Sequence, residues 1–216
     1  MIITIDGPAG AGKTTAAKIL SEKLRFVYLD TGAMYRTVAL YILNNNLDID
    51  NLEEIKKTLK KINIKIEKER IFLNEEDVSE KIRTPEIDLL SSKISTIPVV
   101  RERMVELQKQ YSDKKNIICE GRDMGSIVFP DAEVKFYMDC SLEQRAKRRK
   151  KDFEKKNIKK GIEEIKKELE QRDIRDKNRK HSPLVKVEDA ILIDTTSLTI
   201  DEEIEIMLKY IEEKKR

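Results

Sequence analysis

Residues 2–15 of this chain read IITIDGPAGAGKTT. The β-branched run at residues 2–5 favours a buried strand, and the residues from Lys13 onward begin a helix. Between them, Gly7 to Thr14 fits G-x-x-x-x-G-K-[ST], the phosphate-binding P-loop. The stretch therefore predicts a nucleotide phosphate site between a strand and a helix. A glycine-rich turn with a purely structural role is the alternative.

The chemistry of phosphate binding explains the residue types in this stretch. Glycines let backbone N–H groups close around phosphate oxygens, and the following helix N-terminus adds partial positive charge. Lys13 can reach the β- and γ-phosphates, and the Thr14 hydroxyl can serve as a Mg²⁺ ligand. The residues predicted to bind ATP are Gly7, Pro8, Ala9, Gly10, Ala11, Gly12, Lys13, Thr14 and Thr15.

Composition limits the classes of protein to consider. The 216 residues suit one α/β domain with a lid or an insertion, or two small domains. Lys and Arg number 44 against 41 Asp and Glu, and this near balance does not favour nucleic acid as a partner. Cys119 and Cys140 lie in or beside apolar runs, so we expect packed thiols of a reducing compartment. With neither a signal peptide nor an apolar run of about 18 residues, a cytoplasmic protein without a membrane partner is expected.

A second predicted strand, residues 26–29, ends in the sequence DTGAMYR at residues 30–36. Ligands of open parallel sheets bind beyond the carboxyl ends of the strands. We therefore expect Asp30, Thr31, Tyr35 and Arg36 to lie on the same rim as the P-loop, where Tyr35 can stack and Arg36 can hold a phosphate. Alternatively, Asp30 or Thr31 only caps the next helix, and Arg36 lies in solvent.

A third predicted strand, residues 116–120, ends in Glu120, followed by GRDMGS. A carboxylate at this place beside a P-loop is typical of a residue that holds Mg²⁺, directly or through water. Between the second and third strands, the alternating residues 62–67 and the apolar residues 71–73 predict a small antiparallel hairpin. The next segment, residues 85–111, is predicted to be helical with a break or kink at Pro98.

Arginines cluster on a predicted helical pair near the C-terminus. Arg145 shares a helix face with Arg148 or Arg149, and a second cluster spans residues 171–179. A solvated helical pair is one interpretation. Next to a P-loop, the same arginines can form a lid that stabilises the charge of a transferring phosphoryl group and excludes water.

Three motifs together, at residues 30–36, 121–125 and 172–179, make the chain resemble bacterial cytidylate kinases, which are nucleoside monophosphate kinases. The resemblance spans nearly the whole chain. It implies an α/β P-loop NTPase fold with about five parallel strands, a small antiparallel β insert and an arginine-rich helical lid. It also implies one domain, with its core at residues 1–60, 84–140 and 184–216, the insert at about 61–83 and the lid at about 141–180.

The resemblance implies transfer of a phosphoryl group from ATP to CMP or dCMP by a monomer, with Mg²⁺. By position, Ser92 meets the cytosine and Arg101 the CMP phosphate, while Arg122 and Asp123 hold the monophosphate and the base or sugar. The residues that then face the transferring phosphoryl group are Arg145, Arg148 and Arg172, and those that face CMP are Asp176 and Arg179. Many family members carry Asp at the position of Glu120, so the resemblance leaves open whether Glu120 contacts the metal directly.

A nucleotide-hydrolysing switch or motor is the competing function. A GTPase-type switch uses the motif N-K-x-D to recognise its base. Residues 157–160 and 178–181 come nearest to this motif, but both lack the terminal Asp. The arginine clusters of the predicted lid favour a kinase instead.

Overall fold

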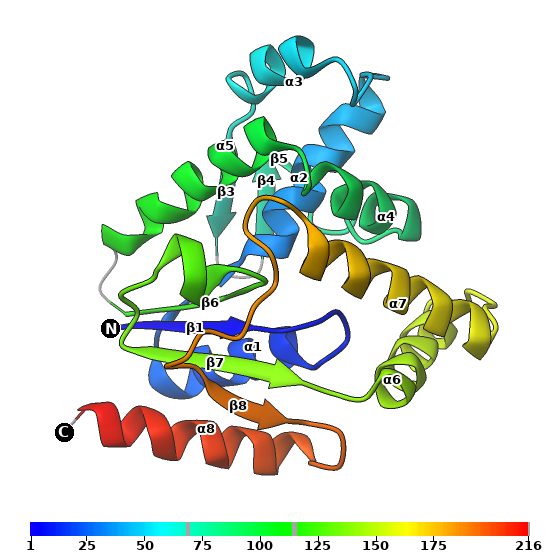
Figure 1. The fold of residues 1–216 in the computed structure, drawn as a ribbon. Helices are drawn as coiled ribbons and strands as arrows, with labels where there is room; N and C mark the ends of the chain where they lie inside the picture. Colours follow the sequence, from blue (N-terminus) through cyan, green and yellow to red (C-terminus); the bar gives the residue numbers. More distant parts are fainter. Residues whose placement is uncertain (68–69, 114–115, 216) are drawn as a thin grey trace. The chain divides into compact units, whose positions relative to one another are not determined.

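The computed structural model describes residues 1–67, 70–113 and 116–215 (Figure 1). It divides into two compact units. The first, called here the P-loop unit, comprises Met1–Tyr28 and Lys115–Arg216, and the second, the inserted unit, is Leu29–Lys114. None of the helices in the described part of the chain combines the length and apolarity that crossing a bilayer requires.

The main sheet has five strands in the order β2-β6-β1-β7-β8. Its strands are β1 (Ile2–Asp6), β2 (Val27–Asp30), β6 (Ile117–Gly121), β7 (Val134–Asp139) and β8 (Ile191–Asp194). The central strand β1 pairs in parallel with β6 and β7, and β8 pairs in parallel with β7. The predicted five-stranded parallel sheet is thus confirmed.

The two faces of this sheet are covered differently. On one face, Ile3, Ile5 and Phe136 form a core with α1 (Lys13–Leu24) and α8 (Ile200–Lys215). Because strand side chains alternate, Thr4 and Asp6 point to the other face. There a single π turn, Met124–Val128, packs on β1, and the segment before β8 packs on β7. Cys119 and Cys140 are both buried and free, as predicted for packed thiols.

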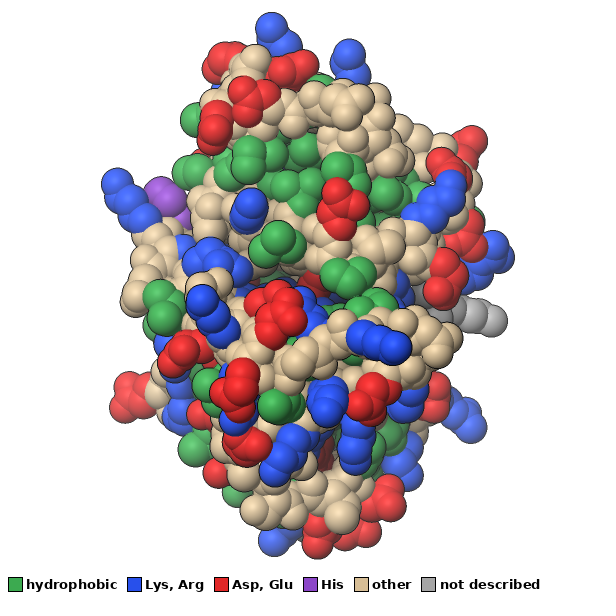
Figure 2. All heavy atoms as spheres, turned by 90° about the vertical axis from the view of Figure 1, so that its right-hand side faces the viewer, with side chains coloured by type: hydrophobic (Ala, Val, Ile, Leu, Met, Phe, Trp, Pro, Cys, Tyr) green, Lys and Arg blue, Asp and Glu red, His purple; other side chains and the backbone are tan. Residues whose placement is uncertain are grey.

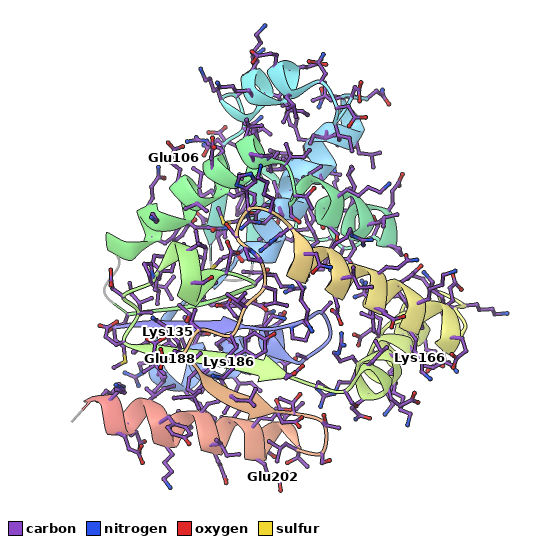
Figure 3. All side chains as sticks on the ribbon, in the orientation of Figure 1. Glu106, Lys135, Lys166, Lys186, Glu188 and Glu202 are labelled. Atoms are coloured by element: carbon purple, nitrogen blue, oxygen red, sulfur yellow. The ribbon has the colours of Figure 1, made fainter. Side chains whose placement is uncertain are left out.

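The predicted arginine-rich helical pair is α6 (Leu142–Lys155) and α7 (Ile162–Asn178), which pack against each other. Ser141 caps α6 by accepting a hydrogen bond from the backbone N–H of Gln144. The pair has its own apolar cluster of Phe153, Ile165 and Leu169, which reaches Ala9 of the P-loop. Lys166 of α7, labelled in Figure 3, also forms an ion pair with Glu143 of α6.

The inserted unit contains four helices and a small antiparallel sheet in its described part. The helices are α2 (Thr31–Asn44), α3 (Leu52–Leu59), α4 (Pro85–Ile94) and α5 (Pro98–Lys109), followed by a 3₁₀ turn (Gln110–Asp113). The sheet consists of β3 (Ile64–Glu67), β4 (Arg70–Leu73) and β5 (Glu76–Asp77). The predicted hairpin is confirmed, and β5 extends it. The helical segment around Pro98 is two helices, because a proline without an N–H is suited to the first turn of α5.

Charged side chains of both signs are interspersed on the face drawn in Figure 2. This mixture matches the near balance of 44 basic and 41 acidic residues in the sequence.

Candidate active site

The P-loop makes a sharp turn between β1 and α1 that requires glycine. A Cβ atom built on Gly7 would lie 2.0 Å from the carbonyl oxygen of Met138, so no side chain fits there. Gly12 has φ +101°, a left-handed conformation that favours glycine. Gly12 also caps α1 without a side-chain hydrogen bond. The first N–H groups of α1 therefore receive no side-chain cap and are suited to binding an anion.

Cationic side chains hold the backbone carbonyls of the P-loop. Lys13 Nζ donates to Pro8 O (2.7 Å). From α6, Arg145 Nη1 donates to Ala9 O (3.2 Å), and Arg148 Nη1 donates to Ala11 O (3.4 Å). In a trans peptide unit the N–H points opposite to the C=O, so each of these contacts also fixes the direction of the next residue's N–H.

Lys13 itself is buried, with 5% of its surface exposed. Burial is the main cause that lowers its pKa to about 7. The charges of Arg122 and Arg172 lower it further, while Glu120 and Asp6 act in the opposite direction. Because like charges repel, this group of cations is stabilised by an anion bound among them.

Asp6, the last residue of β1, is a site residue that sequence reasoning missed. Its carboxylate oxygens accept hydrogen bonds from the backbone N–H groups of Met124 (2.9 Å) and Gly125 (2.8 Å). Burial raises its pKa to about 6, although these two hydrogen bonds lower it. Asp6 thus joins the start of the P-loop to the π turn that follows Asp123. The sequence held one signal for this role, since Asp6 is a carboxylate at the end of a strand predicted to be buried.

Glu120 is the penultimate residue of β6 and has 6% of its surface exposed. Its Oε1 accepts a hydrogen bond from the Tyr28 hydroxyl (2.7 Å). It lies close enough to Lys13 to affect the pKa of that residue. Thr14 is exposed in the first turn of α1. Carboxylate and hydroxyl oxygens are the hard ligands that Mg²⁺ prefers. The described residues contain no cluster of three or more His, Cys, Asp or Glu side chains suited to a metal.

Residues that directly follow β6 form a buried ionic cluster with residues at the C-terminal end of α7. Arg122 Nε donates to Asp176 Oδ2 (2.7 Å), and Arg179 Nη2 lies 3.5 Å from Asp123 Oδ1. Burial raises the pKa of Asp176, but Arg122, Arg172 and Arg179 more than offset this, and its pKa is lowered overall. The structure therefore brings together five residues that were predicted from distant motifs.

Two arginines of α6, Arg145 and Arg148, contact the P-loop. Arg145 is 6% exposed, and its Nη2 lies 2.7 Å from Oδ2 of Asp173, a partner that sequence reasoning missed. Of the two candidates for the same face, Arg148 joins Arg145 at the P-loop. Arg149 stacks on the Phe153 ring, with 4.8 Å from its Cζ to the ring centroid.

In the inserted unit, two arginines lie beside the carboxylate of Asp30. Its side chain caps α2 by accepting from the Ala33 N–H (2.8 Å), as the alternative interpretation had it. That interpretation placed Arg36 in solvent, but Arg36 Nη2 lies 3.1 Å from Asp30 Oδ2. Arg83 Nη2 lies 4.0 Å from the same oxygen. Arg83 was not predicted from the sequence, because it lies between the β insert and α4, outside every motif.

The other predicted residues of the inserted unit are buried on its helices. Arg101 is 3% exposed; it lies over the Tyr35 ring at 5.7 Å and donates through Nη1 to Ser95 O (3.1 Å). Ser92 is buried on α4, and Thr31 is buried at the start of α2.

Known proteins resemble this chain in sequence and in fold. The sequence profile of the cytidylate kinase family matches residues 3–213. A cytidylate kinase of Fusobacterium nucleatum is 46% identical over 215 residues, covering 100% of this chain and 99% of that protein. One from Carboxydothermus hydrogenoformans is 48% identical over 218 residues, covering 99% and 98%. Among solved structures, an uncharacterized protein of Eubacterium ventriosum has a TM-score of 0.56 at 13% identity, covering 98% of each chain, and shares the fold alone.

Proposed function

Because this chain belongs to the cytidylate kinase family, we propose a specific role for each of its site residues in phosphoryl transfer. The enzyme uses ATP to phosphorylate CMP and dCMP, giving ADP together with CDP or dCDP. Direct transfer between two bound nucleotides needs both a donor and an acceptor site, and the proposed residues fall into these two groups.

One observation carries the assignment of the donor site: cations cluster on the P-loop, where the buried Lys13 donates through Nζ to Pro8 O (2.7 Å) and Arg145 and Arg148 donate to Ala9 O and Ala11 O. Such a cluster is costly without an anionic ligand, and a polyphosphate supplies several negative charges. On ATP binding, we expect Lys13 Nζ to exchange Pro8 O for phosphate oxygens. The backbone N–H groups of residues 7–15 hold the remaining oxygens.

The transition state of phosphoryl transfer spreads negative charge over the equatorial oxygens of the γ-phosphoryl group. In our proposal Arg145, Arg148 and Arg172 stabilise that charge. Packing of α6 and α7 over the P-loop excludes water, so that ATP is not hydrolysed. A protein base is not needed, since the acceptor phosphate is already ionised and catalysis consists of positioning and charge stabilisation.

We propose that Thr14 and Glu120 hold Mg²⁺ together with phosphate oxygens. The ion, when bound, neutralises phosphate charge and orients the donor. The contribution of this chain is a hydroxyl from the first turn of α1 and a buried carboxylate at the end of β6.

Two groups of residues bind the acceptor in our proposal. From the P-loop unit, Arg122 and Asp123 bind CMP together with Asp176 and Arg179, whose ionic contacts are already formed. From the inserted unit, Arg36 and Arg101 bind the phosphate and Ser92 the cytosine. The three further acceptor residues proposed are Asp30, Thr31 and Tyr35. The proposal also assigns the whole chain to one cytidylate kinase domain that works as a cytoplasmic monomer on small molecules.

The experiment that tests this function is a coupled measurement of ADP release with ATP and Mg²⁺. The acceptors are CMP, dCMP, UMP, AMP, GMP and shikimate, with an acceptor-free control. Rapid ADP release with CMP and dCMP, and little release without an acceptor, is the expected result. ADP release that does not depend on an acceptor would contradict the proposal and favour a hydrolytic switch.

A further inference from the structure

The turn after β8 has no part in the roles proposed above, yet it contacts the P-loop directly. Thr195 in this turn is fully buried. Its Oγ1 lies 2.9 Å from Ala11 O and 3.2 Å from Asp139 O, both acceptors for its single proton. Arg148 donates through Nη1 to Thr195 Oγ1 (3.1 Å) and through Nη2 to Thr195 O (2.7 Å). The carbonyl of Ala11 is thus reached by both Thr195 and Arg148.

The first turn of α8 adds a buried carboxylate to this group. Glu203 is 3% exposed, and its Oε1 lies 3.6 Å from Arg148 Nη2. A Cβ atom built on Gly12 would lie 3.5 Å from Arg148 Nη1 and 3.6 Å from Glu203 Oε2. The neighbouring Glu202, labelled in Figure 3, is exposed and accepts from the N–H and hydroxyl of Thr199. Of these two neighbouring acids, Glu203 therefore faces the P-loop and Glu202 does not.

Packing alone does not account for an acid at position 203. The other buried residues of α8 are Ile204, Met207 and Ile211, and a fourth apolar side chain would complete that face. Burial raises the pKa of Glu203, and Arg148 partly offsets this effect. A buried carboxylate is costly unless it is paired, and the partner present here is an arginine bound to the P-loop.

We infer that Thr195 and Glu203 are positioning residues of the donor site, acting through Arg148 and the Ala11 carbonyl. The peptide unit between Ala11 and Gly12 is planar and trans. Fixing the carbonyl on the side of Thr195 and Arg148 therefore fixes the Gly12 N–H on the opposite side, where a P-loop amide can donate to phosphate. Glu203 keeps Arg148 in place for this contact.

This inference rests on the proposed donor site, and four substitutions test it. Thr195→Val removes the hydroxyl and keeps the shape, whereas Thr195→Ser keeps the hydroxyl. Glu203→Gln removes the buried charge, and Glu205→Gln removes one charge from an exposed position of the same helix as a control. For each variant, calorimetry gives the Kd of ADP, steady-state kinetics give KM for ATP and for CMP, and circular dichroism gives Tm.

We expect Thr195→Val to weaken ADP binding about tenfold, the scale of one lost hydrogen bond that leaves a buried carbonyl less satisfied. Glu203→Gln should weaken it several-fold. KM for ATP should rise in parallel, KM for CMP should change less than twofold, and Thr195→Ser and Glu205→Gln should behave like the parent protein.

The inference is overturned if Thr195→Val and Glu203→Gln lower Tm without changing ADP affinity, or if they raise both KM values equally. If Thr195→Val does not fold, Glu203→Gln decides the matter alone. ADP binding needs no acceptor, so a parent protein that binds ADP but does not phosphorylate CMP would contradict the proposed function and leave this comparison intact.

Discussion

The hydroxyl of Tyr28 donates a 2.7 Å hydrogen bond to Oε1 of Glu120. Glutamate has one more rotatable bond than aspartate, so its carboxylate is less fixed by the backbone alone. The hydrogen bond from Tyr28 of β2 restrains one oxygen of this carboxylate. Tyr28 thereby positions the carboxylate that we propose for Mg²⁺.

Replacing Tyr28 with Phe should therefore weaken the metal site more than the rest of the enzyme. We expect the Mg²⁺ concentration for half-maximal rate to rise about fivefold, in keeping with one lost hydrogen bond to a charged group that water partly replaces. Mn²⁺ binding in the presence of ADP, followed by electron paramagnetic resonance, provides a readout apart from activity. Tyr210→Phe, at a more exposed tyrosine of α8, is the matched control. Equal Mn²⁺ affinity in both variants would exclude this role for Tyr28.

Lys13 allows a prediction about stability and pH. Its pKa is about 7 in the folded protein, against 10.5 for an unperturbed lysine such as that of the unfolded chain. At pH values between these two pKa values, Lys13 holds its proton in the unfolded chain but loses it in the folded protein. The stability of the parent protein should therefore gain a contribution that rises with pH from about 7 to 10.5.

Lys13→Met should remove that contribution, abolish turnover and leave Tm at pH 7 equal or higher, because a buried charge is lost. Thermal melts of both proteins at pH 6.5 and 9 isolate the effect, since every other titrating group is shared. The donor assignment would be wrong if kcat of Lys13→Met stayed near the parent value.

The sequence identified most of the fold because its signals were local. The P-loop motif, the apolar strands and the helix start at Ser141 each depend on residues close together in the chain. The helix break predicted at Pro98 was also confirmed, because a proline acts on the helix that contains it. β5 was missed because two residues, Glu76 and Asp77, carry no periodicity.

The missed site residues share a different property: their partners are distant in sequence. Asp6 contacts Gly125, Thr195 contacts Ala11, and Glu203 contacts Arg148. Each of these residues falls outside the pattern of the motif it supports. A buried polar side chain is informative once its surroundings are known, but in the sequence it is indistinguishable from a solvated one.

Gln108 is a buried polar residue with a different consequence. Its side chain on α5 is fully buried, and neither its Oε1 nor its Nε2 has a hydrogen-bond partner among the described residues. A buried amide without partners carries a desolvation cost of about 1–3 kcal/mol. Gln108→Met keeps the shape and removes that cost, so the free energy of unfolding should rise by about 1 kcal/mol.

Urea denaturation of Gln108→Met measures this change, with Gln110→Met as the control at an exposed position of the same segment. Activity should stay at the parent level, because Gln108 has no proposed role in catalysis. A loss of stability would mean that the amide has a bound partner, such as an ordered water molecule.

Arg179 tests the acceptor site. It is 8% exposed, its Nη2 lies 3.5 Å from Asp123 Oδ1, and its charge helps to lower the pKa of Asp176. Truncating Arg179 removes a positive charge that lies close to both Asp123 and Asp176. The negative charges of these two carboxylates would then be less compensated, and they would repel the phosphate of CMP more strongly. We expect Arg179→Ala to raise KM for CMP by about tenfold or more, the scale of one charge-assisted contact, while KM for ATP changes little.

Lys180→Ala removes a charge from the neighbouring exposed position and should leave both constants unchanged. If Arg179→Ala instead raised only KM for ATP, Arg179 would belong to the donor site, and the division of residues between donor and acceptor would have to be redrawn.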